Sequence, residues 1–146
     1  MATTFRTDVV AGLKDVLDDF TGAANAFTLV ATYTTRPASF ARPTPFAFIG
    51  IRPETVVHDV GTRTRTMQPT VTIVVQLVDN PTTMARLDRL IDLLHDAFTG
   101  RPHLAGNATI WKGGLTVSDE FVAEGDSIFQ AVTFTFLDVS TQEGRT

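Results

Sequence analysis

The sequence predicts a single α+β domain, in which two amphipathic helices pack on one face of a single-layer antiparallel or mixed β-sheet. Three observations predict this class. Two stretches place apolar residues at helical spacing, several others alternate apolar and polar residues, and most connections resemble hairpin turns. Helices joined to a sheet by short connections are typical of α+β layers. With 146 residues, the chain is expected to form one domain over residues 1–146.

The clearest pattern runs from Thr70 to Gly100 and comprises a strand followed by a helix. In the strand, alternate residues form an apolar face that is expected to lie on the core: Val71, Ile73, Val75 and Leu77. The opposite face is mixed, with Thr70, Thr72, Val74, Gln76 and Val78. We therefore expect this second face to be at most half covered within one subunit.

A helix is predicted after this strand because its start, apolar face and end agree. Asn80 can cap it, Pro81 suits the first helical position, and Gly100 with Pro102 ends it. The residues expected to share the core-facing side are Met84, Leu87, Leu90, Ile91, Leu93, Leu94, Ala97 and Phe98. Such a wide apolar face predicts burial against the sheet.

A first helix is predicted from Thr4 to Phe20, with one apolar face and an acidic C-terminal end. Asp15, Asp18 and Asp19 oppose the helix dipole there, by about 0.3–1 kcal/mol each. Two interpretations follow. The carboxylates form a solvated helix end, or Asp18 and Asp19 belong to a patch that meets an arginine of a neighbouring subunit.

Alternation predicts further strands at Phe27–Thr34, Phe46–Ile51, Glu54–Val60, Ala108–Lys112, Leu115–Ala123 and Ser127–Val139. Pro53 is expected to end the second of these, and Glu124–Asp126 to join the last two as a hairpin. Trp111 is expected to be partly buried. The proline-rich segment Arg36–Pro45 is predicted to be an extended loop anchored by Phe40. The polar tail, about 140–146, is expected to fray.

The segment Gly61–Pro69 is predicted to form an extended hairpin arm. Threonine and arginine alternate in it, Arg63 and Arg65 share one side, and Met67 is its first apolar residue. One interpretation is a mobile solvated loop. The other is an arm that becomes ordered against a partner, because arginine suits carboxylate and phosphate contacts.

No reactive constellation is found in the sequence. It has no cysteine, no nucleotide-binding or hydrolase motif, and its histidines His58, His95 and His103 lack metal-ligand spacing. Scattered charges and a net charge of −4 argue against sequence-specific nucleic-acid binding. Neither a signal peptide nor a membrane span is predicted. We expect no enzyme activity, cofactor or metal.

Taken over nearly its full length, the chain resembles tail terminator proteins of long-tailed, lambda-like bacteriophages (siphoviruses). The resemblance rests on the order and character of TFRTDVVAGLKDVLDDF, FTLVATYT, RPTPFAFIGI, GTRTRTMQP, TVTIVVQLVDN, PTTMARLDRLIDLLHDAF and FQAVTFTFLDV. It implies a small α/β subunit that forms a homohexameric ring, caps the tail tube, stops its polymerisation and offers the head-joining surface.

The resemblance also implies the partners and the location of the protein. The partners would be further copies of the chain, the tail tube protein and a head-completion or neck protein. The chain would reside at the head-proximal end of the virion tail, and in the host cytoplasm during assembly. Candidate subunit or tube contacts are Arg63, Arg65, Met67, Asp18 and Asp19. Two alternatives stay open: a head–tail neck or completion protein, and a small ligand-binding or enzymatic domain using His58, His95 or paired carboxylates.

Overall fold

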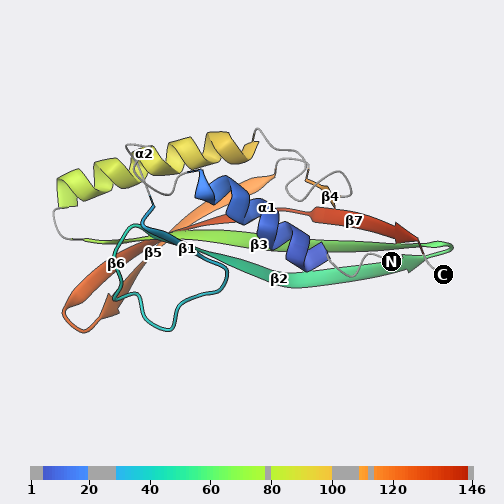
Figure 1. The fold of residues 1–146 in the computed structure, drawn as a ribbon, viewed down its shortest axis with the longest axis horizontal. Helices are drawn as coiled ribbons and strands as arrows, with labels where there is room; N and C mark the ends of the chain where they lie inside the picture. Colours follow the sequence, from blue (N-terminus) through green and yellow to red (C-terminus); the bar gives the residue numbers. More distant parts are fainter. Residues whose placement is uncertain (1–4, 20–28, 78–79, 100–108, 112–113, 145–146) are drawn as a thin grey trace.

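The computed structural model describes residues 5–19, 29–77, 80–99, 109–111 and 114–144 (Figure 1). Within them the chain forms two helices and a seven-stranded, mostly antiparallel sheet, which confirms the predicted α+β class. The elements are α1 (Phe5–Asp18), β1 (Ala31–Tyr33), β2 (Phe46–Asp59), β3 (Thr62–Gln76), α2 (Asn80–Thr99), β4 (Thr109–Ile110), β5 (Leu115–Glu124), β6 (Ser127–Phe136) and β7 (Val139–Gly144). Strand β1 runs parallel to β2, and the other paired strands are antiparallel.

Strand β3 is the centre of the sheet along its whole length. On one side it pairs with β2. On its other side it pairs with β6 over Thr70–Gln76 and with β7 over Thr62–Met67. Strands β1 and β5 extend the sheet beside the Thr70–Gln76 half of β3, and β4 adds to β7 beside the Thr62–Met67 half. The strand therefore has two halves with different neighbours.

Pro69 lies where the two halves of β3 meet. The register Thr70↔Thr135 changes to Met67↔Val139, so four residues of the β6–β7 segment span three of β3. Between Ile51 and Glu54, β2 likewise gains one residue relative to β3. These are β-bulges on both neighbours of a proline, which cannot donate a backbone hydrogen bond to a central ladder.

The apolar sides of both helices belong to one core that includes alternate residues of the sheet, and Figure 1 shows both helices on the same side of the strands. Phe98 of α2 packs edge-on against Phe134 and Phe136, with ring centroids 5.8 and 4.8 Å apart. From the helices the core takes Phe5, Val9, Leu13, Val16, Leu17, Leu87, Leu90, Leu94 and Phe98. Burial of the predicted face Val71, Ile73 and Val75 is confirmed.

The opposite face of the sheet carries a second, smaller core around Phe40 and Val74. It contains Phe40, Phe46, Phe48, Val74, Phe129 and Ala131. The expectation that this face is at most half covered within one subunit is wrong for Thr72 and Val74, which are both buried. The reason is that the proline-rich loop folds back over the sheet and inserts Phe40, as the sequence predicts for that residue.

Several predicted boundaries also change. Pro53 does not end β2, because the bulge between Ile51 and Glu54 accommodates it. The expectation of a frayed tail is wrong for Ser140–Gly144, which pairs with β3. Trp111 is fully rather than partly buried, and its indole N–H donates to the carbonyl oxygen of Gly114 at 2.9 Å. Of the predicted elements, residues 4, 20, 27–28, 78, 100, 108 and 112 lie outside the described part of the chain, as do His103 and residues 145–146.

Candidate functional site

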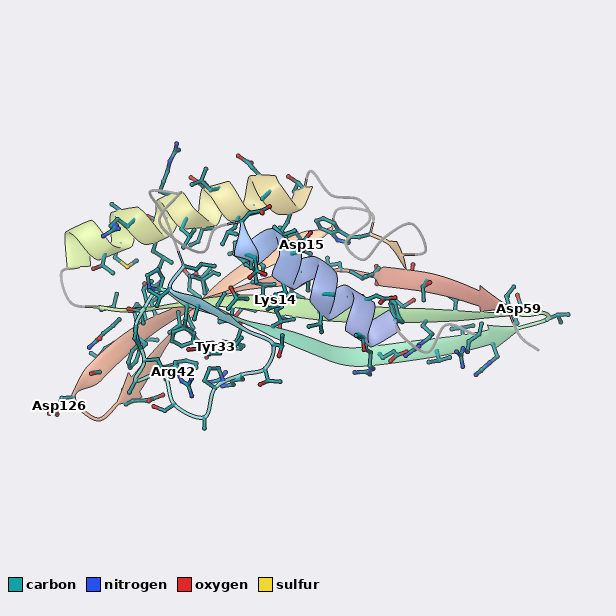
Figure 2. The ribbon with its side chains drawn as sticks, in the orientation of Figure 1. Lys14, Asp15, Tyr33, Arg42, Asp59 and Asp126 are labelled. Carbon is teal, nitrogen blue, oxygen red and sulfur yellow. The ribbon has the colours of Figure 1, made fainter. Side chains whose placement is uncertain are left out.

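The β2–β3 hairpin reaches one end of the long axis of the molecule, where Figure 2 labels Asp59. We call residues Glu54–Met67 the β2–β3 end. Asp59 pairs with Thr62, so the turn consists of Val60 and Gly61. Gly61 has a φ of 77°, a left-handed conformation that glycine adopts without strain. Val60 is 95% exposed at this turn.

Arg65 is held by contacts within its own chain. Its Nε donates to Glu54 Oε2 at 2.5 Å, and its Nη2 to Glu54 Oε1 at 3.2 Å. Arg6 of α1 donates from Nε to the same Oε1 at 2.8 Å. The Arg65 guanidinium also lies 5.2 Å from the ring centroid of Phe5. Glu54 therefore joins α1 to β2 and β3, and Arg65 has a structural role that its sequence position alone does not reveal.

Hydrogen bonds from Arg65 are the largest influence on Glu54 and hold the pKa of its carboxyl below the ordinary 4.5. Burial opposes this effect by raising the pKa, and the hydrogen bond from Arg6 adds to the lowering. The Glu54 side chain is 9% exposed and that of Arg65 is 14% exposed. A carboxylate stabilised by two guanidinium groups forms ion pairs that link elements far apart in the sequence.

The other two predicted residues of this segment differ in accessibility. Met67 is 1% exposed and belongs to the core beneath the helices, so its side chain is not offered to a partner on this surface. Arg63 is partly exposed and pairs in register with His58 of β2. Of Arg63, Arg65 and Met67, Arg63 is therefore the strongest surface candidate.

Arg63 lines a shallow groove of about 510 Å³ on the helix-facing side of the β2–β3 end. The other lining residues are Arg6, Glu54, Val56 and Arg65. We call these five residues the basic groove, because three of its lining side chains carry guanidinium groups and one carries a carboxylate. Val56 adds a half-exposed apolar side chain. Arginines in such a position can receive carboxylates.

Asp18 and Asp19 are exposed at the opposite end of α1. Lys14 Nζ bonds to Asp18 Oδ2 at 3.0 Å, an exposed pair one helical turn apart. The helical rise places Asp18 about 18 Å along α1 from Arg6. Figure 2 shows the neighbouring Lys14 and Asp15 near the middle of the molecule, away from Asp59. The structure thus does not bring Asp18 and Asp19 together with Arg63.

The β5–β6 hairpin is a surface candidate that the sequence reasoning missed. We call residues Leu115–Phe136 the acidic hairpin, because they include four carboxylate side chains and no lysine or arginine: Asp119, Glu120, Glu124 and Asp126. Phe121 is 68% exposed, and Val117 and Ile128 are about half exposed. The signal available in the sequence was the presence of Phe121 and Ile128 in a segment whose charged side chains are all acidic.

The exposed apolar residues of the acidic hairpin share one face. In register, Val117 pairs with Phe134, Asp119 with Val132 and Phe121 with Gln130. Phe134 and Val132 face the helix-side core, so Val117, Asp119 and Phe121 lie on that same side of the sheet. Ile128 shares it because it is two residues from Gln130. Strand β5 is an edge strand among the described residues.

Glu124 has a different role from the other acids of the hairpin. Its carboxylate accepts hydrogen bonds from the Phe40 N–H at 2.9 Å and from the Ser39 hydroxyl at 2.7 Å. The Phe40 N–H is the main cause that lowers the pKa of Glu124, followed by the Ser39 hydroxyl. Glu124 therefore fixes the proline-rich loop over the second core.

The residues considered for a catalytic or ligand site lie apart. His58 is exposed on β2, and His95 is exposed on α2. A cleft of about 530 Å³ beside β2 is lined by Arg6, Arg36, Phe48 and several threonines. Within the described residues, no three histidine or carboxylate side chains gather in a way that could hold a metal ion.

In the part of the chain that the structure describes, neither helix has the length and apolarity needed to cross a membrane. No protein-family model matches the sequence, and the search of curated proteins found no significant match.

Proposed function

We propose that this chain is a structural assembly subunit that associates with copies of itself, and that it acts as a tail terminator of a long-tailed bacteriophage. Its assembled form would be a homohexameric ring at the head-proximal end of the tail tube. There it would stop tube polymerisation and provide the surface that joins the head. The β2–β3 end would be the arm that contacts a neighbouring subunit or the tube.

The observation that carries the self-assembly proposal is the exposure of apolar side chains at both ends of an elongated molecule. One end has Val56, Val57 and Val60, and the other has Phe121 and Ile128. Asp59 and Asp126 mark these two ends in Figure 2. On the acidic hairpin, Phe121 and Ile128 share one face, and an exposed apolar patch is typical of interaction surfaces. Two different surfaces at opposite ends suit a head-to-tail contact, which closes into a ring when the rotation between subunits permits.

The more specific role of tail terminator rests on the resemblance in element order and on the Arg-bearing β2–β3 end. Electron microscopy of tails assembled with and without the protein tests it. We expect tails of abnormal length in its absence, and a ring of this subunit on the end of normal tails. Tails of normal length without the protein would contradict the terminator role.

The same experiment distinguishes the neck or completion protein considered above. Loss of a neck protein would leave tails of normal length that fail to join heads. A small ligand-binding or enzymatic domain would instead bind a small molecule as a monomer, with affinity that depends on His58, His95 or paired carboxylates.

A further inference from the structure

We infer that the acidic hairpin of one copy docks into the basic groove of the next copy. This inference rests on the proposed self-assembly and specifies the two surfaces that meet. It assigns the exposed apolar residues of β5 and β6 a partner of stated chemistry: an arginine-rich groove with one apolar side chain in its lining.

The charge of the two surfaces is complementary. Among the described residues, the groove lining has three guanidinium groups, from Arg6, Arg63 and Arg65, and one carboxylate, that of Glu54. That carboxylate already accepts hydrogen bonds from Arg6 and Arg65. On the acidic hairpin, Asp119 lies on the proposed contact face, whereas Glu120 lies on the other face and Glu124 accepts hydrogen bonds from the proline-rich loop. Complementary potentials of this kind set the orientation and rate of association.

The apolar residues of the two surfaces are also arranged to meet. On the acidic hairpin, Asp119 lies between Val117 and Phe121 on the helix-facing side of β5, and Ile128 lies beside them on β6. In the groove, Val56 lies on the same face as Arg63 and Arg65, since it pairs with Arg65 in register. A hairpin inserted with this face inward brings Asp119 to the guanidinium groups and Phe121 to Val56.

The positions of the two surfaces make the contact heterologous. They lie at opposite ends of the long axis, as Asp59 and Asp126 show in Figure 2. A hairpin therefore cannot reach the groove of its own chain, and each copy offers one hairpin and one groove to its neighbours. Such subunits associate head to tail.

The test is a charge reversal at one position with a control on the opposite face of the same strand. Asp119→Arg changes the proposed contact face, whereas Glu120→Arg makes the same change on the other face. Both residues are exposed, so both variants are expected to keep the wild-type circular dichroism spectrum. In sedimentation velocity, Asp119→Arg is expected to raise the dissociation constant of self-association by about tenfold or more, and Glu120→Arg by much less.

The groove is tested in the same way with Arg63→Glu, and Thr64→Glu on the opposite face of β3 is its control. Arg63→Glu is expected to weaken association as Asp119→Arg does. An equimolar mixture of Asp119→Arg and Arg63→Glu should regain association. One copy then retains an intact groove and the other an intact hairpin, and the two altered surfaces are again opposite in charge.

The outcomes separate this inference from the proposed function. If wild-type protein associates and both reversals associate equally well, or if Glu120→Arg weakens association as much as Asp119→Arg, the docking inference is wrong while self-assembly stands. If Arg63→Glu retains self-association but loses binding to tail tubes, the groove serves the tube protein and the inference is also wrong. If wild-type protein stays monomeric at every concentration, both the inference and the proposed self-assembly fail.

Discussion

The two halves of β3 are both paired with antiparallel strands, but they differ in how far their side chains are buried. In the half from Thr70 to Gln76, the five residues from Val71 to Val75 are all buried, between the helices on one face and Phe40 on the other. In the half from Thr62 to Gln68, only Met67 is buried. The Thr70–Gln76 half therefore supports the fold, while the Thr62–Gln68 half presents side chains to the surroundings.

The difference arises from what covers each half. The Thr70–Gln76 half packs against α2 and the proline-rich loop. The Thr62–Gln68 half is instead held by pairing with β7 and by the hydrogen bonds of Glu54 with Arg65 and Arg6. One continuous strand can therefore stabilise the fold with one half and present an interaction surface with the other. Pro69 and the bulges beside it mark the boundary.

The largest expected effect is a cavity in the buried half. Ile73 is fully buried in the helix-side core, so Ile73→Ala should lower the free energy of unfolding by about 2–5 kcal/mol. Val57 in the β2–β3 end is 59% exposed, and Val57→Ala should change it by less than about 0.5 kcal/mol. Urea unfolding of both variants measures the contrast. Equal losses would show that the two halves are not energetically distinct.

Loss of the Glu54 carboxylate should have an intermediate effect. Glu54→Gln removes the negative charge that pairs with Arg65, whose side chain is 14% exposed, and hydrogen bonds to charged groups contribute about 1.5–3 kcal/mol. We expect destabilisation within this range, measured by urea unfolding at neutral pH. Asp18→Asn, which removes the exposed pair with Lys14, is the control, and should cost about 0.5 kcal/mol or less. A Glu54→Gln variant as stable as wild type would show that the ion pairs of Glu54 do not stabilise the fold.

The same carboxylate predicts a pH dependence. Hydrogen bonds from Arg65, and then from Arg6, lower the folded-state pKa of Glu54 below the ordinary 4.5. Its stabilisation is therefore fully present above about 4.5, and is lost as the pH falls from there through the lower folded-state value. The difference in unfolding free energy between wild type and Glu54→Gln should shrink over that acidic interval. If this difference in unfolding free energy stays constant with pH, the stabilisation does not come from the ionised Glu54 carboxylate.

The smallest effect on stability is expected for Arg63, and it separates two arginines that look alike in the sequence. Arg63→Ala should leave the unfolding free energy within about 0.5 kcal/mol of wild type, but weaken self-association. Arg65→Ala should destabilise the fold because Glu54 loses its closest partner. Thermal unfolding and sedimentation of both variants provide the test. A double variant of Arg63 and Arg65 would confuse the two roles.

The sequence predicted the buried half of β3 and α2 well because elements that pack on a core have apolar residues at regular local spacing. Val71, Ile73 and Val75 alternate, and the helix beginning at Asn80 has a consistent apolar face. It predicted the Thr62–Gln68 half less well because alternating threonine and arginine suit a solvated loop and a partly exposed strand equally. Pro53 indicated an end to β2, and only the bulge beside it explains why the strand continues.

The interaction surfaces were harder to predict because they depend on contacts between distant residues. Arg63 and Arg65 have the same sequence environment, yet Arg65 bonds to Glu54, whose other partner, Arg6, lies 48 positions away. The covering of Val74 by Phe40 and the pairing of β7 with β3 are also non-local. The exposed face of the acidic hairpin depends on the register of β5 with β6, which leaves the Phe121 side chain exposed outside the core.

The central claim is that the chain assembles with copies of itself, and sedimentation velocity over a wide range of protein concentrations tests it most directly. We predict a mass that rises with concentration from the 15.9 kDa of one subunit to that of a closed ring of six, with weaker association at high salt. A mass that remains at one subunit up to the limit of solubility would contradict the account.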